Sequence, residues 1–211
     1  IKGLYHINAV DCITQWQVVA SVQAISEAHL LSVIEEMLAQ FPFEILGFHA
    51  DNGSEYVNHK VARLLEKLRI EFTRSRPRHS NDNALAETKN GAVVRKEFGY
   101  AHIHRRHAAR FDTYCREYLN PFLNFHRPCL FATELADPKK PGRIKRVYRP
   151  RDAMTPLDKL ASLPNAASFL RPGVTLLELQ QLARALSDVQ AAQELNEARQ
   201  ALFKRADIRT G

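Results

Sequence analysis

The hydrophobic and polar positions of this chain change their period several times, as expected for a protein that mixes strands with helices. Residues 4–10 and 17–22 are short runs rich in apolar and β-branched side chains, and the polar segment DCITQW joins them. Two such runs predict a β-hairpin. Residues 26–41 carry apolar side chains at helical spacing, and Pro42 ends the helix that they predict.

Strand and helix patterns then alternate as far as residue 130. The predicted elements are a strand over 44–49, a helix with one apolar face over 57–68, a strand over 70–73, a helix from Asn83 to Phe98 that stops at Gly99, and a helix over 106–119 that Asn120-Pro121 breaks. This order predicts an α/β domain.

The composition changes after residue 130. Residues 137–151 contain seven basic residues and one acidic residue, which predicts an exposed basic linker. Thr155-Pro156 indicates a short helix over 156–162, and Thr175 with Glu178 forms a capping-box pattern before a long amphipathic helix. The predicted division is a core over 1–130, a basic linker with a short helix over 131–172, and a C-terminal amphipathic helix over 173–211.

The charge of the chain indicates a polyanionic partner. The formal net charge of the 211 residues is +7 at a sequence pI of about 9.5, although a solvated basic surface gives the same balance. No apolar run reaches the length of a membrane-spanning helix, and the first residues do not resemble a signal peptide. The three cysteines form no zinc or disulfide pattern, which favours a reducing compartment.

Two carboxylates are candidates for metal-dependent phosphodiester chemistry. Asp51 follows an apolar strand, and Glu87 lies in the first turn of the predicted third helix. Glu87 shares a helix face with Val94 and Phe98, so we expect it on the buried side, where a carboxylate needs a metal or a hydrogen-bonding partner. Two divalent cations held by carboxylates can neutralise the charge of such a transition state. Alternatively, Asp51 only forms a turn and Glu87 only complements the helix dipole.

The spacing and the surrounding residues resemble a known family. Between Asp51 and Glu87 lie 35 residues, and the segments ADNGSEYV (50–57), SRPRHSNDNALAETKNG (75–91) and NPFLNFHRP (120–128) flank or follow them. This pattern resembles the D,D-35-E integrases and transposases of retroviruses and bacterial insertion sequences, over about residues 4–130.

The resemblance implies an RNase H-like fold, in which helices flank a mixed sheet, and an enzyme that cleaves DNA and transfers the strand with Mg²⁺ or Mn²⁺. It implies that Asp51 and Glu87 are catalytic metal ligands and that residues 74–82 form a mobile active-site loop. The candidate nucleic-acid-binding residues, which include two from the basic linker, are Arg74, Arg76, Arg78, Lys89, Arg95, Lys96, Lys145 and Arg146.

Two interpretations are open for the family's first catalytic Asp. Asp11 is the only acidic residue among the first 26 and is therefore one candidate. Alternatively, YHINAVDCITQW resembles the second strand of the family, in which case the first strand and its Asp lie upstream of Ile1. The fold would then lack its first strand, and another chain could pair with the backbone groups left open.

The resemblance also implies partners and a location. We expect DNA, as element ends and target, a homo-oligomer with the helix over 174–204 as a possible contact, no membrane, and the cytoplasm of a bacterium near its nucleoid. Two alternatives to an integrase are a non-catalytic DNA-binding or assembly remnant of a mobile element and a hydrolytic RNase H-like nuclease. The cluster of His102, His104 and His107 fits a basic surface patch better than a metal site.

Overall fold

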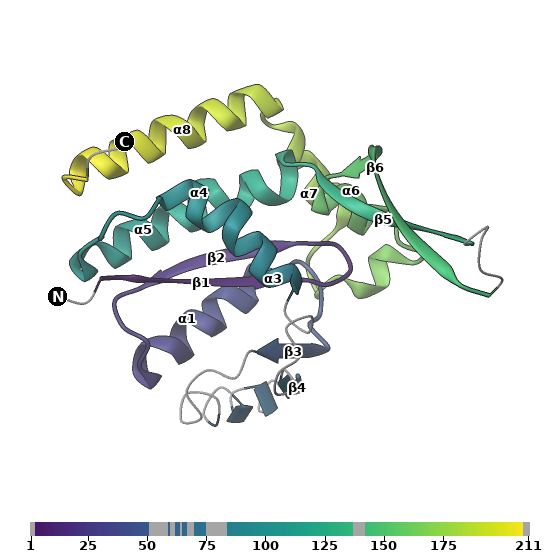
Figure 1. The fold of residues 1–211 in the computed structure, drawn as a ribbon, viewed down its shortest axis with the longest axis horizontal. Helices are drawn as coiled ribbons and strands as arrows, with labels where there is room; N and C mark the ends of the chain where they lie inside the picture. The colour runs from purple at the N-terminus through teal and green to yellow at the C-terminus, as the bar shows by residue number, and fades with distance from the viewer. Residues whose placement is uncertain are drawn as a thin grey trace.

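The computed structural model describes residues 3–50, 59, 62–63, 65–66, 70–74, 84–136 and 142–208. Strands and helices are mixed along the chain, which confirms the predicted α/β class (Figure 1). The strands are β1 (Tyr5–Val10), β2 (Gln17–Val22), β3 (Gly47–Ala50), β4 (Glu71–Arg74), β5 (Cys129–Ala136) and β6 (Ile144–Met154). The α-helices are α1 (Glu27–Ala39), α3 (Ala84–Lys89), α4 (Arg95–Phe98), α5 (Ala108–Tyr114), α6 (Pro156–Ala161), α7 (Leu176–Arg184) and α8 (Asp188–Arg205).

The described strands form three separate pairs. β1 and β2 are antiparallel, with Tyr5 opposite Val22, and they form the predicted hairpin. β3 and β4 are parallel, and β5 and β6 are antiparallel. In Figure 1, α1 lies on one side of the β1–β2 hairpin, whereas α5 lies on the other side with α8 packed outside it.

The core forms on both faces of β2, all six residues of which are buried. Val18 and Ala20 pack with Met37 of α1, whereas Val19 packs with Phe111 of α5. Successive side chains of a strand point to opposite faces, so one apolar strand serves two hydrophobic clusters. β2 is therefore the central element against which the helices of both faces are placed.

The two helices predicted around residues 83–98 and 106–119 are longer or less regular than the pattern indicated. The first runs from α3 through the π-helical segment η2 (Asn90–Val94) into α4 and ends at Gly99, whose φ of 69° suits glycine. The second does not end at Asn120-Pro121. It continues from α5 through two π-helical segments, η4 (Cys115–Leu119) and η5 (Phe122–His126). Pro121 has no N–H to donate, and it lies between the two π-helical segments, where α-helical bonding is already interrupted.

Side chains of this long helix occupy the outer edge of β2. The Asn124 Oδ1 atom accepts a hydrogen bond from the Gln17 amide (2.8 Å), and the Asp112 Oδ1 atom accepts one from the Ser21 amide (2.9 Å). Asn120 bonds to both backbone groups of Val19, with distances of 2.9 and 3.1 Å. An unpaired strand edge invites pairing with another chain, so these side chains close the edge of β2.

The outer edge of β1 has no comparable cover among the described residues. The Asp11 amide bonds to the Trp16 carbonyl at the β2 side, whereas the Leu4 amide bonds outward to the Ile103 carbonyl (2.9 Å). Backbone groups alternate in direction along a strand, so those of His6, Asn8 and Val10 point away from β2. Hydrogen bonds to β3 are absent from the described part of this edge.

The basic linker predicted over residues 131–172 is wrong over 131–136 and 144–154, because these residues belong to the paired strands β5 and β6. Ala132 pairs with Tyr148 and Ala136 with Ile144, and a bulge separates this part of the hairpin from the Cys129–Met154 end. Cross-strand pairs and the hydrogen bonds on either side of the bulge outweigh the low hydrophobicity of the segment. Figure 1 shows the β5–β6 hairpin extending away from the rest of the molecule.

The single C-terminal helix expected over 174–204 is two helices. α7 ends at Arg184, and α8 begins after Ser187, whose hydroxyl accepts a hydrogen bond from the Gln190 amide while the Gln190 side chain bonds back to Ser187. This capping box starts a new helix and changes the chain direction. The capping box of Thr175 and Glu178 was predicted and is confirmed. No helix in the described part of the chain is long and apolar enough to cross a membrane.

Candidate functional site

Glu87 lies in the first turn of α3, which packs over β1. The Asn8 side chain of β1 donates a hydrogen bond from Nδ2 to the Ala86 carbonyl (3.4 Å), next to Glu87 in the chain. The Glu87 side chain is exposed. The structure therefore places this candidate carboxylate at the start of a helix, beside the open edge of the β1–β2 hairpin.

The exposure of Glu87 corrects the expectation that it shares the buried helix face. Phe98 is buried and Val94 is partly buried, as predicted, but Glu87 is not. The physical reason is the π-helical segment between them, in which the Arg95 amide bonds to the Asn90 carbonyl. An i→i+5 bond adds a residue to the turn and rotates the helix faces, so positions before Asn90 lose register with those after it.

Asp11 closes the β1–β2 hairpin. Its Oδ2 atom accepts hydrogen bonds from the Thr14 amide (2.6 Å), the Thr14 hydroxyl (2.6 Å) and the Ile13 amide (3.2 Å). Such a side chain stabilises a turn by replacing backbone partners. These contacts give Asp11 a structural role at the strand end, and its role as a third catalytic carboxylate stays a prediction.

Asp51, the other predicted metal ligand, lies outside the described residues, as do Arg76 and Arg78. The strand β3 ends at Ala50, directly before Asp51 in the sequence, and pairs in parallel with β4. Within the residues that the structure describes, no three His, Cys, Asp or Glu side chains come together as a metal site. Glu87 is thus the described member of the predicted metal-ligand pair.

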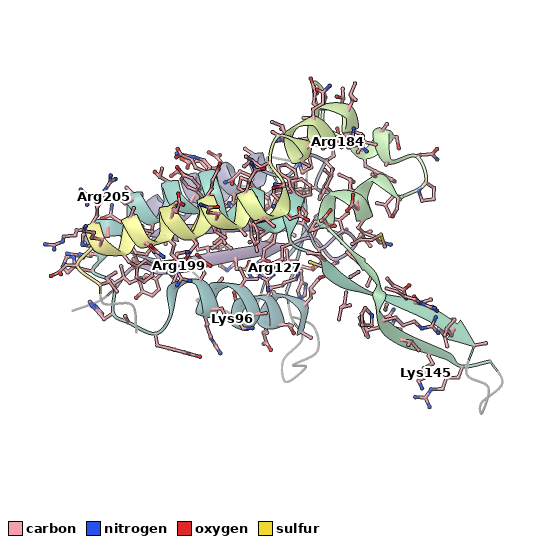
Figure 2. The ribbon with its side chains drawn as sticks, turned by 90° about the horizontal axis from the view of Figure 1, so that it is seen from above. Lys96, Arg127, Lys145, Arg184, Arg199 and Arg205 are labelled. Carbon is pink, nitrogen blue, oxygen red and sulfur yellow. The ribbon has the colours of Figure 1, made fainter. Side chains whose placement is uncertain are left out.

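The basic residues predicted to contact DNA have different environments. Lys89 is partly buried and its Nζ atom donates to Cys129 Sγ (3.0 Å), which links α3 to β5. Arg95 and Lys96 are exposed on α4, and Lys96 is labelled in Figure 2. The described part of Arg74 is its backbone, in β4. Arg95 and Lys96 are therefore the accessible candidates of the core.

The β5–β6 hairpin carries the remaining two predicted contacts. Lys145 is exposed, whereas Arg146 pairs with Glu134 on the opposite strand (Nε to Oε1, 3.1 Å). Apolar side chains lie beside them, since Ile144 is 61% and Tyr148 60% exposed. Figure 2 shows Lys145 toward the distal part of the hairpin. A two-stranded ribbon of this kind fits the major groove of duplex DNA.

Sequence reasoning missed this hairpin because the charge of the segment dominated the interpretation. Proline and glycine residues around 138–142 separate the two runs, and apolar residues such as Val147 and Tyr148 lie in the second run. A turn pattern between two runs that contain apolar residues is typical of a hairpin. This pattern could have indicated the β5–β6 hairpin from the sequence.

Comparison with known proteins agrees with the sequence pattern. Residues 1–80 match the family model described as Integrase core domain. This match confirms the integrase resemblance for that part of the chain. An uncharacterized protein of Sinorhizobium fredii, y4rM, is 32% identical over 93 residues, which are 44% of this chain and 27% of the relative. The chain therefore spans about a quarter of the length of the curated relative that it matches.

Proposed function

We propose that the intact protein integrates or transposes DNA, by metal-dependent cleavage of a phosphodiester bond followed by strand transfer. The observation that supports this most directly is the integrase core domain match over residues 1–80. Glu87 is separated from Asp51 by 35 intervening residues and belongs to a helix that packs on the matched hairpin. The chemistry is therefore assigned to the region where α3 packs on β1.

An RNase H-like arrangement is part of this proposal. The β1–β2 hairpin and the parallel β3–β4 pair would belong to one mixed sheet, with helices on both faces. Two features support this: α1 packs with β2 on one face, and the β1 edge opposite β2 carries unpaired backbone groups among the described residues. An additional strand beside β1 would pair with the backbone groups of this edge.

Mg²⁺ or Mn²⁺ is the cofactor that this function implies. An exposed carboxylate such as Glu87, together with Asp51, is a donor set of the kind that hard cations prefer. Asp11 fits less well, since its Oδ2 atom already accepts three hydrogen bonds within the hairpin. When bound, the metal would neutralise charge that develops on the phosphate oxygens. Glu87 would position it from the start of α3.

We also propose that the protein acts as an oligomer on paired DNA ends. The C-terminal helices carry exposed apolar side chains that suit such a contact, because Leu182 of α7 is 60% and Val189 of α8 is 77% exposed. Exposed apolar groups gathered on one segment are typical of association surfaces. Leu182→Glu should reduce the mass measured by analytical ultracentrifugation, whereas the exposed-site control Gln181→Glu should not.

The decisive experiment compares Glu87→Gln with Glu117→Gln in the full-length protein. Both carboxylates are exposed and lie on helices, but Glu117 belongs to η4 and pairs with Arg116 at 4.0 Å. We expect Glu87→Gln to abolish cleavage and joining of labelled element-end DNA in Mn²⁺, because a neutral amide is a weaker metal ligand. Glu117→Gln should retain both activities.

DNA binding separates the possible outcomes. Glu87→Gln should bind the same DNA as tightly as the parent protein in the absence of metal, since the substitution removes no cation. Loss of binding in this variant would contradict the metal-ligand role. If the parent protein cleaves DNA but does not join it, a hydrolytic nuclease is favoured. If the parent protein shows neither activity, a non-catalytic DNA-binding remnant is favoured.

A further inference from the structure

Three arginines and a histidine from three segments line one cavity at the C-terminal end of α8. The cavity has a volume of about 350 Å³. Its walls are Arg106 and His107 of the 3₁₀ turn η3 (Arg105–His107), Arg110 of α5, and Arg205, the last residue of α8. Figure 2 shows Arg205 at the opposite end of the molecule from Lys145 of the hairpin. Sequence reasoning did not select any of the three arginines.

No carboxylate balances these arginines within the part of the chain that the structure describes. The ion pairs there join Arg116 to Glu117, His126 to Asp188, Arg146 to Glu134, and Arg151 to Asp152. Arg106 instead donates from Nε to His107 Nε2 (3.1 Å), which is a neutral acceptor. Like charges that share a cavity repel each other, so a bound anion would stabilise this arrangement.

The pKa of His107 reports the electrostatic potential in the cavity. His107 is buried, and burial together with the positive charges of Arg106 and Arg110 and of the neighbouring His104 lowers its pKa below the ordinary value. Burial disfavours the protonated ring, and adjacent cations disfavour it further. The direction of the shift agrees with a positive cavity that contains no compensating acid.

We propose that this cavity binds a phosphate group. Arginine presents a planar fork of N–H donors that matches phosphate oxygens in a bidentate manner. Arg106, Arg110 and Arg205 are exposed and line the same open pocket, so their guanidinium groups can contact different oxygens of one tetrahedral anion. On the function proposed above, on which this step rests, the phosphate belongs to the backbone of duplex DNA.

The cavity lies far from the other predicted DNA contact on the β5–β6 hairpin. It lies at the end of α8, whereas the exposed Lys145 lies on the hairpin at the other end of the molecule (Figures 1 and 2). Phosphate contacts fix the register and orientation of a protein on DNA without reading its sequence. A phosphate held here would anchor DNA at a second point, remote from the hairpin.

The first test measures DNA binding in two variants with the same net charge. Arg110→Gln/Arg205→Gln removes two cations from the cavity, and the control Arg116→Gln/Arg184→Gln removes two exposed cations from elsewhere in the fold. Affinity for a fluorescein-labelled duplex is measured by anisotropy over a range of NaCl concentrations. We expect the slope of log K against log salt to fall by about one in the cavity variant, because the one phosphate contact that the arginines share is lost and each such contact contributes about 0.9. The control should keep the slope of the parent.

The second test uses inorganic phosphate and follows the His107 ring by NMR. A bound anion should raise the pKa of His107, because it offsets the positive charges of Arg106 and Arg110. Chloride at equal ionic strength should leave the pKa in place, and so should phosphate with the Arg110→Gln/Arg205→Gln variant. No response of the parent protein to phosphate would overturn the site.

The two tests distinguish the source of the phosphate. A reduced salt slope together with the NMR response supports DNA backbone as the ligand. An NMR response with an unchanged slope supports the cavity but overturns DNA as its ligand, in favour of a free phosphate compound. Equal slope changes in both double variants would overturn a specific contact. Cleavage by the parent and its loss in Glu87→Gln are read separately, so failure of the cavity does not count against the proposed function.

Discussion

Asn120 exchanges two hydrogen bonds with the backbone of Val19: its Oδ1 atom accepts from the Val19 amide (2.9 Å) and its Nδ2 atom donates to the Val19 carbonyl (3.1 Å). A side-chain amide thus takes the place of a neighbouring strand at the edge of β2. Asn124 repeats the arrangement at Gln17, where both distances are 2.8 Å. The long helix of α5, η4 and η5 is thereby fixed to the central strand by polar contacts inside the core.

Asn120→Ala should lower the free energy of unfolding by about 2–3 kcal/mol, because two backbone groups of Val19 lose their partners in a buried position. Asn120 also bonds to Gln40 Oε1 (2.8 Å), so the end of α1 loses a contact as well. Urea denaturation checks the change, with the exposed Asn196→Ala as a control that should stay within about 0.5 kcal/mol of the parent. A small effect at Asn120 would mean that water replaces the amide.

Hydrogen exchange should differ between the two sides of β1. The amides of Ile7 and Ala9 bond to β2, whereas those of His6, Asn8 and Val10 point outward. We expect the outward amides to exchange faster in this chain, because solvent reaches them without opening the hairpin. Exchange NMR measures this residue by residue. Slow exchange at all five positions would show that another segment already pairs with this edge.

Protonation of His6 should destabilise the protein at low pH. The ring stacks on Phe98, with centroids 4.0 Å apart, and Nδ1 lies 2.9 Å from Ser21 Oγ. Burial lowers the pKa of His6 from 6.5 to about 4. The unfolded chain therefore binds more protons between these values, so this contribution is complete above pH 6.5 and is lost as the pH falls toward 4.

His6→Gln isolates that contribution, since glutamine does not titrate. The free energy of unfolding of the parent should fall by up to about 3 kcal/mol more than that of the variant between pH 7 and pH 4, on the scale of about 1.4 kcal/mol per unit of pKa. Urea denaturation at several pH values gives both curves. Parallel curves would show that His6 protonates without cost in the folded state.

Two neighbouring residues of the hairpin should contribute unequally to DNA binding. Lys145 is exposed and has no ion-pair partner among the residues that the structure describes, whereas Arg146 pairs with Glu134 at 3.1 Å. Lys145→Gln should lower the slope of log K against log salt by about one, because it removes one phosphate contact. Arg146→Gln should change it less, since Glu134 already offsets that charge. Equal slopes in Lys145→Gln and the parent protein would show that the hairpin does not touch DNA.

The sequence by itself determined the features that depend on neighbouring residues. Apolar periodicity identified the β1–β2 hairpin and α1, Gly99 marked the end of α4, and the Thr175–Glu178 capping box marked the start of α7. The separation of Asp51 and Glu87 and the residues around them indicated an integrase core, and the comparison with known proteins agreed over residues 1–80. Periods, caps and short motifs are local properties, and they can be read without the fold.

Only the tertiary structure decided the features that join distant residues. Asn120 and Val19 are separated by 101 positions, and nothing near either residue predicts that a side chain will close the edge of β2. The cavity of Arg106, Arg110 and Arg205 depends on how α8 returns to the start of α5. The exposure of Glu87 depends on the π-helical segment that rotates one helix face against the next. In each case the packing of the whole chain sets the geometry. Residues that are remote in sequence come together, and this decides which backbone groups find a hydrogen-bond partner and which charges stay without a counter-charge.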